Sequence, residues 1–358
     1  MAARRILVTG AGGVGGVNFI NAARIAEDYF IVGVDHDDYY LQLPRVEARF
    51  KSPRHDDPSF IPLIRKLVDE YGVEFIHPQP EVEVEVIASS KAELEGVKTL
   101  LPGLDAIKIA RDKLRTAEVL KRAGVNVPDT APFSPEDVED LLQRHGRLWV
   151  RSRKGAGGKL SLPVNSVEEA ELWVKLWVKR GAVSEEDFIV QEYLPGRDVA
   201  WDSLWFEGKL VASYARERLR YIFPHVSPSR VTGTPTVAKI IRDAVVNEVA
   251  ERAVKAIDPK PQGFYCVDLK FDKRGRPAVT EVNIKAHTTL GLWSYVAQRA
   301  LSLSRSFNLV YLYLQLGLEG EVEGPPRPYD IYPEVTLMRH IDAGVLVEVN
   351  GEWRRVEY

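Results

Sequence analysis

The residues best suited to chemistry lie on two short segments near position 275. In the second segment Glu281, Asn283 and Lys285 alternate with apolar residues, so a strand places all three on one face. Asp268 joins that face if residues 263–271 form the other strand of a hairpin. Two carboxylates and an amide make an oxygen-only ligand set, which suits a magnesium ion that also binds nucleotide phosphates. The alternative is an ordinary half-exposed strand pair.

A second candidate motif opens the chain. Gly10, Gly12 and Gly15 follow an apolar run and spell G-x-G-x-x-G. Asp35 lies 20 residues past the third glycine, where a Rossmann fold keeps the carboxylate that binds the ribose of a dinucleotide. Taken alone, this motif predicts an NAD site and an NAD(P)-dependent oxidoreductase.

The pattern of expected helices and strands that must position these residues differs between the first hundred residues and the rest of the chain. Over the first hundred residues, apolar runs alternate with amphipathic segments, a pattern that predicts a parallel, doubly wound sheet. The expected strands are 4–9, 30–35 and 73–77, and the expected helices are 14–27, 59–71 and 81–94.

After Pro102-Gly103 the pattern mixes hairpins with helices. A last hairpin, 345–349 with 353–356, is expected to pack against the core or against a partner subunit, which leaves a homodimer as one option. The other expected helices are 111–123, 168–179, 238–257 and 292–317, and the other expected strands are 148–151, 188–193, 199–206, 209–217, 263–271 and 276–283.

The composition is that of a globular protein and argues against several classes. The 358 residues are 45% hydrophobic and 28% charged, and the net charge of -3 gives no reason to expect nucleic acid or an anionic membrane as a partner. Cys266 is the only cysteine, and no histidine cluster accompanies it to make a zinc site. No signal-peptide pattern is present and no apolar run reaches the ~20 residues that cross a bilayer, so we expect a cytoplasmic protein.

Four motifs then occur in one order along the sequence. They are DKLRTAEVLKRAGVNVPDT from Asp112, RSRKGAGG from Arg151, QEYLPGRDVAWDS from Gln191, and the pair VDL and EVN of the predicted metal hairpin. On these motifs the sequence resembles the ATP-grasp superfamily, most closely the branch related to the large subunit of carbamoyl phosphate synthetase. The resemblance covers about residues 105 to 300.

The resemblance implies an α/β fold in three parts. Residues 1–103 look like the Rossmann-like domain that precedes an ATP-grasp domain. An α+β ATP-grasp fold, whose two subdomains clasp ATP, is expected over 104–325, with a small lid subdomain at about 125–195. A short C-terminal β-hairpin extension is expected over 326–358.

The resemblance also implies roles for individual residues. Phosphate contacts are expected from Lys113, Arg151 and the loop glycines, adenine contacts from the segment that begins at Gln191, and a ribose contact from Asp198, for which a structural turn acid is the alternative. The expected cofactor-binding residues are Lys113, Arg151, Gly155, Gly157, Gly158, Gln191, Glu192, Tyr193, Leu194 and Asp198; the expected metal ligands are Asp268, Glu281 and Asn283; and the expected catalytic residues are Arg151, Asn283 and Lys285.

The acceptor substrate is expected between the glycine loop and the metal site. Arginines at positions 216, 218 and 220 recur at period two, which makes one strand face positive and suggests an anionic small molecule; a solvated strand face is the alternative. His287 is assigned no catalytic role. In ATP-grasp relatives the loop of the first domain often borders the acceptor. The expected substrate residues are therefore Gly12, Gly13, Arg216, Arg218 and Thr288.

These implications favour one reaction class. An enzyme that uses ATP and Mg²⁺ (or Mn²⁺) would activate a carboxylate as an acyl phosphate, which an amine then attacks with release of phosphate. The alternatives are a kinase-like phosphotransferase, the NAD(P)-dependent oxidoreductase suggested by the first glycine motif, and a nucleotide-binding regulatory protein that has kept the fold.

Overall fold

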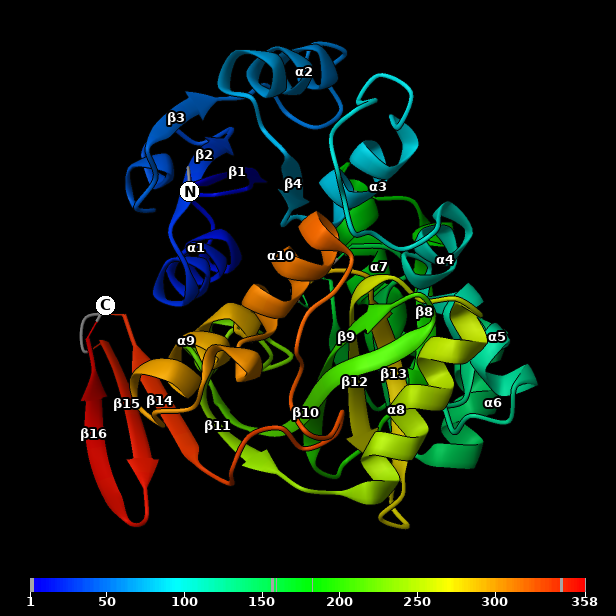
Figure 1. Ribbon diagram of the computed structural model, residues 1–358. Helices are drawn as coiled ribbons and strands as arrows, with labels where there is room; N and C mark the ends of the chain where they lie inside the picture. The colour runs from blue at the N-terminus through cyan, green and yellow to red at the C-terminus, as the bar shows by residue number, and fades with distance from the viewer. Residues whose placement is uncertain (1–2, 156–157, 159, 182, 342–343, 358) are drawn as a thin grey trace.

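The computed structural model describes residues 3–155, 158, 160–181, 183–341 and 344–357. Strands in this part of the chain form three sheets: a parallel sheet of four strands, a separate antiparallel sheet of four strands, and a sheet of eight (Figure 1). None of the helices within these ranges has the length and apolar character needed to span a bilayer.

The parallel sheet is built by the first 78 residues in the order β3-β2-β1-β4. Side chains of β1 alternate between its faces: Ile6 packs with the cluster around α1, whereas Leu7 packs with the cluster around α2. Helices therefore cover both faces, and the doubly wound arrangement predicted from the sequence is confirmed. The elements are β1 (Arg4–Thr9), α1 (Val14–Ala26), β2 (Tyr29–Asp35), β3 (Ala48–Lys51), α2 (Phe60–Tyr71), β4 (Phe75–Pro78) and α3 (Glu81–Ser89).

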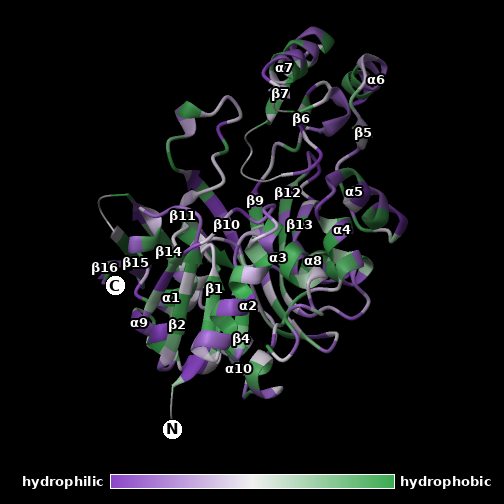
Figure 2. Cartoon of the chain, turned by 90° about the horizontal axis from the view of Figure 1, so that it is seen from above, coloured by the Kyte–Doolittle hydropathy of each residue, from purple (hydrophilic) through white to green (hydrophobic). Residues whose placement is uncertain are grey.

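The small antiparallel sheet has the order β5-β8-β6-β7 and packs against two helices. Figure 2 shows this unit projecting from the rest of the chain. Each helix begins at a serine whose side chain accepts a backbone N–H, Ser134 for α6 and Ser166 for α7. The elements are β5 (Thr130–Pro132), α6 (Pro135–His145), β6 (Leu148–Ser152), β7 (Leu162–Val164), α7 (Val167–Lys179) and β8 (Phe188–Glu192).

The large sheet has the order β13-β12-β9-β10-β11-β14-β15-β16. One face packs against α4, α5 and α8, and the opposite face packs against α1, α9 and α10, so this sheet joins the N-terminal layer to the rest of the chain (Figure 1). The strands are β9 (Asp198–Phe206), β10 (Lys209–Tyr221), β11 (Pro235–Ile241), β12 (Gly263–Phe271), β13 (Pro277–Asn283), β14 (Thr336–His340), β15 (Gly344–Val349) and β16 (Glu352–Val356); the helices are α4 (Leu104–Ala110), α5 (Lys113–Arg122), α8 (Ala244–Ile257), α9 (Leu290–Arg299) and α10 (Leu309–Glu319).

Two long helices predicted from the sequence are wrong in extent. The helix expected over 238–257 starts only after Asp243, whose carboxylate accepts the N–H groups of Val245 and Val246, while the residues before it pair with β10 as strand β11. The helix expected over 292–317 is two helices, and Asn308 caps the second by accepting two backbone N–H groups. In both cases a side-chain cap sets the start of the helix.

The C-terminal hairpin is present, and it extends the large sheet. β15 pairs with β16, and β14 connects this hairpin to β11 through Val237, Ala238 and Lys239. The hairpin thus packs against the core of this chain, which is one of the two locations expected from the sequence.

Candidate functional site

A cavity of about 380 Å³ lies between the small sheet and the large sheet. Its walls contain most of the residues that the sequence assigned to ATP, metal and substrate. From the small sheet come Arg151, Gln191 and Glu192, and from the large sheet come Asp268 and Glu281. Segments as far apart in the sequence as Arg151 and Glu281, 130 residues, therefore meet at one site.

The predicted metal hairpin is an antiparallel pair of β12 and β13. Asp268 on β12 pairs directly with Glu281 on β13, and Cys266 pairs with Asn283. Asn283 Nδ2 lies 3.5 Å from Asp268 Oδ2, so the two carboxylates and the amide share one face of the sheet. The alternation expected from the sequence holds for Glu281 and Asn283, whereas Lys285 lies beyond the end of β13.

Two cations from other elements reach Glu281 across the cavity. Arg151 Nη2 on β6 lies 2.7 Å from Glu281 Oε2, and Lys113 Nζ at the start of α5 lies 3.7 Å from the same oxygen. Burial alone would raise the pKa of Glu281, but Arg151 and Lys113 outweigh it and hold that pKa below its usual value. Burial lowers the pKa of Lys113. Glu281 is thus an ionised carboxylate between two basic groups.

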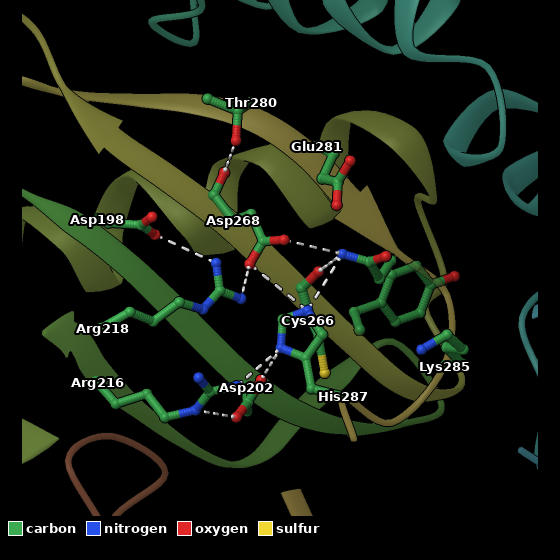
Figure 3. Close-up of polar contacts among 12 residues, drawn as sticks. Asp198, Asp202, Arg216, Arg218, Cys266, Asp268, Thr280, Glu281, Lys285 and His287 are labelled. Carbon is green, nitrogen blue, oxygen red and sulfur yellow. Dashed lines mark hydrogen bonds and ion pairs between the residues drawn. The ribbon is translucent and has the colours of Figure 1, made fainter. Parts of the chain in front are cut away.

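Asp268 has a different cation. Arg218 on β10 donates to Asp268 Oδ1 at 2.5 Å and to Asp198 Oδ1 at 3.2 Å (Figure 3). Asp198 also accepts from the Tyr221 hydroxyl at 2.9 Å. Asp198, expected near a ribose, is therefore part of the polar network that ends at the metal hairpin, and its role as a ribose contact stays a prediction.

A buried triad of Asp202, Arg216 and His287 lies under the hairpin, and sequence reasoning had placed only Arg216 in the site, as a substrate residue. His287 Nδ1 lies 2.5 Å from Asp202 Oδ1, and Arg216 Nε donates to Asp202 Oδ2 at 3.1 Å. Because a carboxylate only accepts, His287 Nδ1 carries the proton, and His287 Nε2 accepts from Asn283 Nδ2 at 3.2 Å. His287 thus orients a predicted metal ligand, a structural role that agrees with the absence of a catalytic assignment from the sequence.

The signal for Asp202 was available in the sequence. Asp198 and Asp202 are four residues apart on β9, so they lie on the same face of that strand, and Asp202 pairs with Cys266 in the neighbouring strand. Three ligand-type atoms, from Asp202, Cys266 and His287, lie within 4.8 Å of one another. Arg216 and His287 already bind the Asp202 carboxylate, and they hold its pKa low against the opposing effect of burial.

The arginine strand differs from its prediction. Arg216 is 1% exposed and paired with Asp202, and Arg218 is paired with two carboxylates. An irregularity in the β10–β11 pairing falls between Arg218 and Arg220, and Arg220 is exposed. The strand face is therefore not strongly positive, because the acids of β9 and β12 neutralise it.

The predicted nucleotide segments also reach the cavity. Gln191, Glu192, Tyr193 and Leu194 line it, as does Gly158. The Lys113 ammonium donates to the Gly155 carbonyl at 2.6 Å, which ties α5 to the second glycine loop. Gly157 lies outside the described residues.

Of the remaining predicted site residues, some line the cavity and others do not. Thr288, Lys285, Arg216 and Arg218 line the cavity, whereas Gly12 and Gly13 are not among its lining residues. The Gly12 N–H donates to Asp35 Oδ2 at 2.9 Å, within the first sheet. The acceptor-side prediction thus gains geometric support beyond β13 and none at the glycine loop.

Known proteins resemble the chain in the part that holds the cavity. A family model described as an ATP-grasp domain matches residues 110–289, half of the chain. The chain belongs to the ATP-grasp family. This finding confirms the family and the fold class predicted from the sequence motifs.

Two curated relatives overlap the same region. A phosphoribosylamine–glycine ligase of Archaeoglobus fulgidus is 24% identical over 233 residues, which cover 60% of this chain and 47% of that protein. A probable alpha-L-glutamate ligase of Xanthomonas oryzae pv. oryzae is 32% identical over 196 residues, which cover 53% of this chain and 62% of that protein. The ATP-grasp chain thus spans only about half to three fifths of these relatives.

Solved structures share the fold over nearly the whole chain. An L-amino acid ligase from Bacillus licheniformis superimposes with a TM-score of 0.69 at 18% identity, covering 94% of this chain and 80% of that one. An N5-carboxyaminoimidazole synthetase from Staphylococcus aureus, complexed with ADP, gives a TM-score of 0.66 at 15% identity, with coverages of 94% and 82%. At these identities the likeness concerns the fold.

Proposed function

We propose that this ATP-grasp protein is an ATP- and Mg²⁺-dependent ligase that activates a carboxylate as an acyl phosphate for attack by an amine, releasing ADP and phosphate. One observation carries the proposal: Glu281, which shares a sheet face with Asp268 and Asn283, forms ion pairs with Arg151 of β6 and Lys113 of α5. Relatives that are named ligases support it.

The ion pairs around Glu281 suit a site that exchanges counter-ions. Without nucleotide, Arg151 and Lys113 neutralise Glu281. Polyphosphate oxygens would give both cations new anionic partners, and Glu281 would then be free to bind a metal cation that accompanies the nucleotide. The charges of the cavity stay compensated in both states, so loading requires no uncompensated buried charge.

The donor set of the metal hairpin fits magnesium. Asp268 and Glu281 supply carboxylate oxygens from paired positions. Asn283 directs its Nδ2 toward His287 Nε2, Asp268 and the Cys266 carbonyl, which leaves its Oδ1 as an acceptor for a cation. Hard oxygen ligands of this kind are those that Mg²⁺ prefers, and the ion would supply neutralisation of phosphate charge when bound.

In the proposed reaction the protein's side chains position and neutralise. Arg151 and Lys113 hold the phosphates, and Lys285 supplies a further cation just beyond β13, where its Nζ donates to the Ala286 carbonyl at 3.4 Å. Cys266 does not serve as a nucleophile, because burial raises the pKa of its thiol well above the usual value. The attacking atoms therefore come from the two substrates.

Other parts of the sequence-based description remain within this proposal. They are the domain division at residues 103 and 325 with a lid at about 125–195, an anionic small-molecule acceptor, a homodimer, and a cytoplasmic location. Mn²⁺ in place of Mg²⁺ is likewise proposed.

The test is turnover of MgATP against defined substrates. Release of ADP is measured with each of the 20 standard amino acids as carboxylate donor, alone, in pairs, and with hydroxylamine. Hydroxylamine traps an acyl phosphate as a hydroxamate, which reports activation even when the natural amine is absent from the panel.

Three outcomes separate the reaction classes. ADP release together with hydroxamate, or with a new amide, supports the ligase. A stable phosphorylated product formed without amine makes the protein a phosphotransferase and overturns the ligase assignment. If the protein binds MgAMP-PNP but releases no ADP with any pair, the regulatory alternative replaces it.

A further inference from the structure

Two side-chain amides of the N-terminal layer donate hydrogen bonds to the loop that follows β13. Gln79 Nε2 donates to the Ala286 carbonyl at 2.9 Å, and Asn18 Nδ2 donates to the Thr288 carbonyl at 2.7 Å. Both amides are buried. Residues 284–289 connect β13 to α9 and bring Lys285, His287 and Thr288 to the cavity.

The Gln79 side chain is itself held in place by a series of hydrogen bonds through His77 and Tyr313. Its Oε1 lies 3.1 Å from His77 Nε2, and His77 Nδ1 lies 3.2 Å from the Tyr313 hydroxyl. Because the Ala286 carbonyl can only accept, Gln79 must present its NH2 group there and its oxygen to His77. His77 therefore carries its proton on Nε2, and Nδ1 accepts from Tyr313.

The imidazole is held in that neutral form. Burial lowers the pKa of His77 to about 3. Its ring stacks on Phe19 with a centroid separation of 3.7 Å and an interplanar angle of 5°. Each hydrogen bond from Tyr313 through His77 and Gln79 to Ala286 thus has a defined donor and acceptor, and each side chain has one orientation.

The glycines permit this approach. A Cβ at Gly15 would lie 2.6 Å from Gln79 Nε2, and a Cβ at Gly291 would lie 2.5 Å from the Asn18 backbone. Real Cβ atoms do not come so close. Gly15 therefore leaves room for the Gln79 side chain, and Gly291 lets α9 approach the Asn18 backbone. Gly15, the third glycine of the N-terminal motif, thereby leaves space for the side chain that holds the cavity loop at Ala286.

We propose that Gln79 and Asn18 are positioning residues, which set the place of Lys285, His287 and Thr288 through the backbone of residues 286–288. This inference rests on the proposed ligase function for its kinetic test. Neither amide is among the residues that line the cavity. Misplacing a reacting or charge-bearing group by about 1 Å costs up to ~100-fold in rate.

The experiment compares Gln79→Met with Asn247→Leu. Gln79→Met keeps the length of the side chain and removes both of its hydrogen bonds. Asn247 is a buried amide that also makes two side-chain bonds, to Trp201 and Asp330, and it does not line the cavity. The control variant thus loses a comparable set of buried bonds elsewhere in the chain.

Each variant is measured by thermal unfolding, by calorimetric affinity for MgAMP-PNP, and by the kcat and KM of ADP release with the best pair of the panel. Both variants are expected to lose stability. Gln79→Met alone should lose about 10- to 100-fold in kcat, with its MgAMP-PNP affinity within about 2-fold of the parent. Equal kcat values for Gln79→Met and the parent would overturn the proposal. If Gln79→Met does not fold, the isosteric Asn18→Asp, which removes the donor to Thr288, takes its place.

A spectroscopic arm does not depend on turnover. With labelled histidine, nitrogen chemical shifts give the tautomer of each ring; His77 should carry its proton on Nε2, and the His287 signals should shift in Gln79→Met but not in Asn247→Leu. Unchanged His287 signals would contradict positioning even if the protein proves not to be a ligase. Failure of the parent to bind MgAMP-PNP would instead remove the proposed function and leave this arm standing.

Discussion

Two glycine-rich regions of the molecule carry the marks of a nucleotide site, and they differ in what occupies their polar groups. In the N-terminal loop the Gly12 N–H is bound by Asp35 and the Gly13 N–H by the Gly10 carbonyl. Around the cavity, by contrast, Lys113 and Arg151 form ion pairs with Glu281, and we propose that a charged ligand replaces them. The polar groups of the first region are bound within the chain, whereas those of the second are proposed to change partners.

The difference shows what a glycine motif does and does not indicate. Glycines report that backbones approach closely, and in the first loop the approaching groups are protein: the Tyr40 backbone beside Gly12 and the Gln79 side chain beside Gly15. The presence of a ligand is indicated better by concentrated opposite charges at a cavity.

Glu281→Gln should abolish most turnover. The substitution removes the carboxylate that pairs with Asp268 on the proposed metal-binding face and that balances Arg151. Because a metal contributes several kcal/mol to a charged transition state, we expect ADP release to fall at least about 100-fold. Glu217→Gln is the control, since Glu217 binds Arg197 on the same sheet and does not line the cavity. Its rate should stay within about 2-fold; equal rates in both variants would refute the metal assignment.

Gly12→Ala should damage the fold and spare the nucleotide site. Its Cβ would lie 2.5 Å from the Tyr40 carbonyl carbon, and such overpacking costs about 2 to 3 kcal/mol of unfolding free energy. Gly13→Ala is the matched control, because its Cβ would meet only the Gly10 carbonyl at an ordinary 3.4 Å. Denaturant unfolding gives the stabilities and calorimetry gives the MgAMP-PNP affinity. A loss of affinity in both variants would place the loop at the nucleotide.

Glu83→Gln should make stability less dependent on pH. Burial, together with the nearby Asp35, raises the pKa of Glu83 from 4.5 to about 7. A raised pKa means that the folded state holds the proton more tightly than the unfolded state does, so stability falls as pH rises from about 4.5 to 7. Between pH 5 and pH 8 the parent should lose about 2 kcal/mol through this group, and Glu83→Gln should not.

Denaturant unfolding at the two pH values measures the difference. The control is Glu93→Gln, because Glu93 is exposed and its carboxylate keeps its hydration. Identical pH dependence in Glu83→Gln and the parent would show that Glu83 ionises without cost in the fold, and hence that the end of the first sheet is more open to water than its burial indicates.

The local parts of this description could be predicted from sequence patterns. Period two gave the face shared by Asp268, Glu281 and Asn283, because alternation along a strand is a local property. The start of α8 could not be read in the same way. The β11 residues Val237 to Ile241 also fit a helix, and pairing with β10 decides between the two.

Long-range contacts were beyond the reach of any pattern in one segment. Asp202 and His287 are 85 residues apart, and Gln79 and Ala286 are 207 apart, so nothing in either segment indicates its partner. From the sequence of β10 alone, its arginines suggested a positive strand face. The acids that neutralise them lie on neighbouring strands and could not be assigned as their partners from that segment.

The smallest expected effect is that of NAD, which should leave the thermal midpoint unchanged. MgAMP-PNP at about 100 times its Kd should stabilise the folded protein by about 2.7 kcal/mol by mass action. NAD at the same concentration should give no shift, because a dinucleotide would need the Asp35 carboxylate, which already accepts the N–H groups of Gly12 and Asp37. Asp35→Asn separates the remaining cases: an NAD shift in the parent that disappears in this variant would return the N-terminal loop to dinucleotide binding and erase the contrast between the two regions.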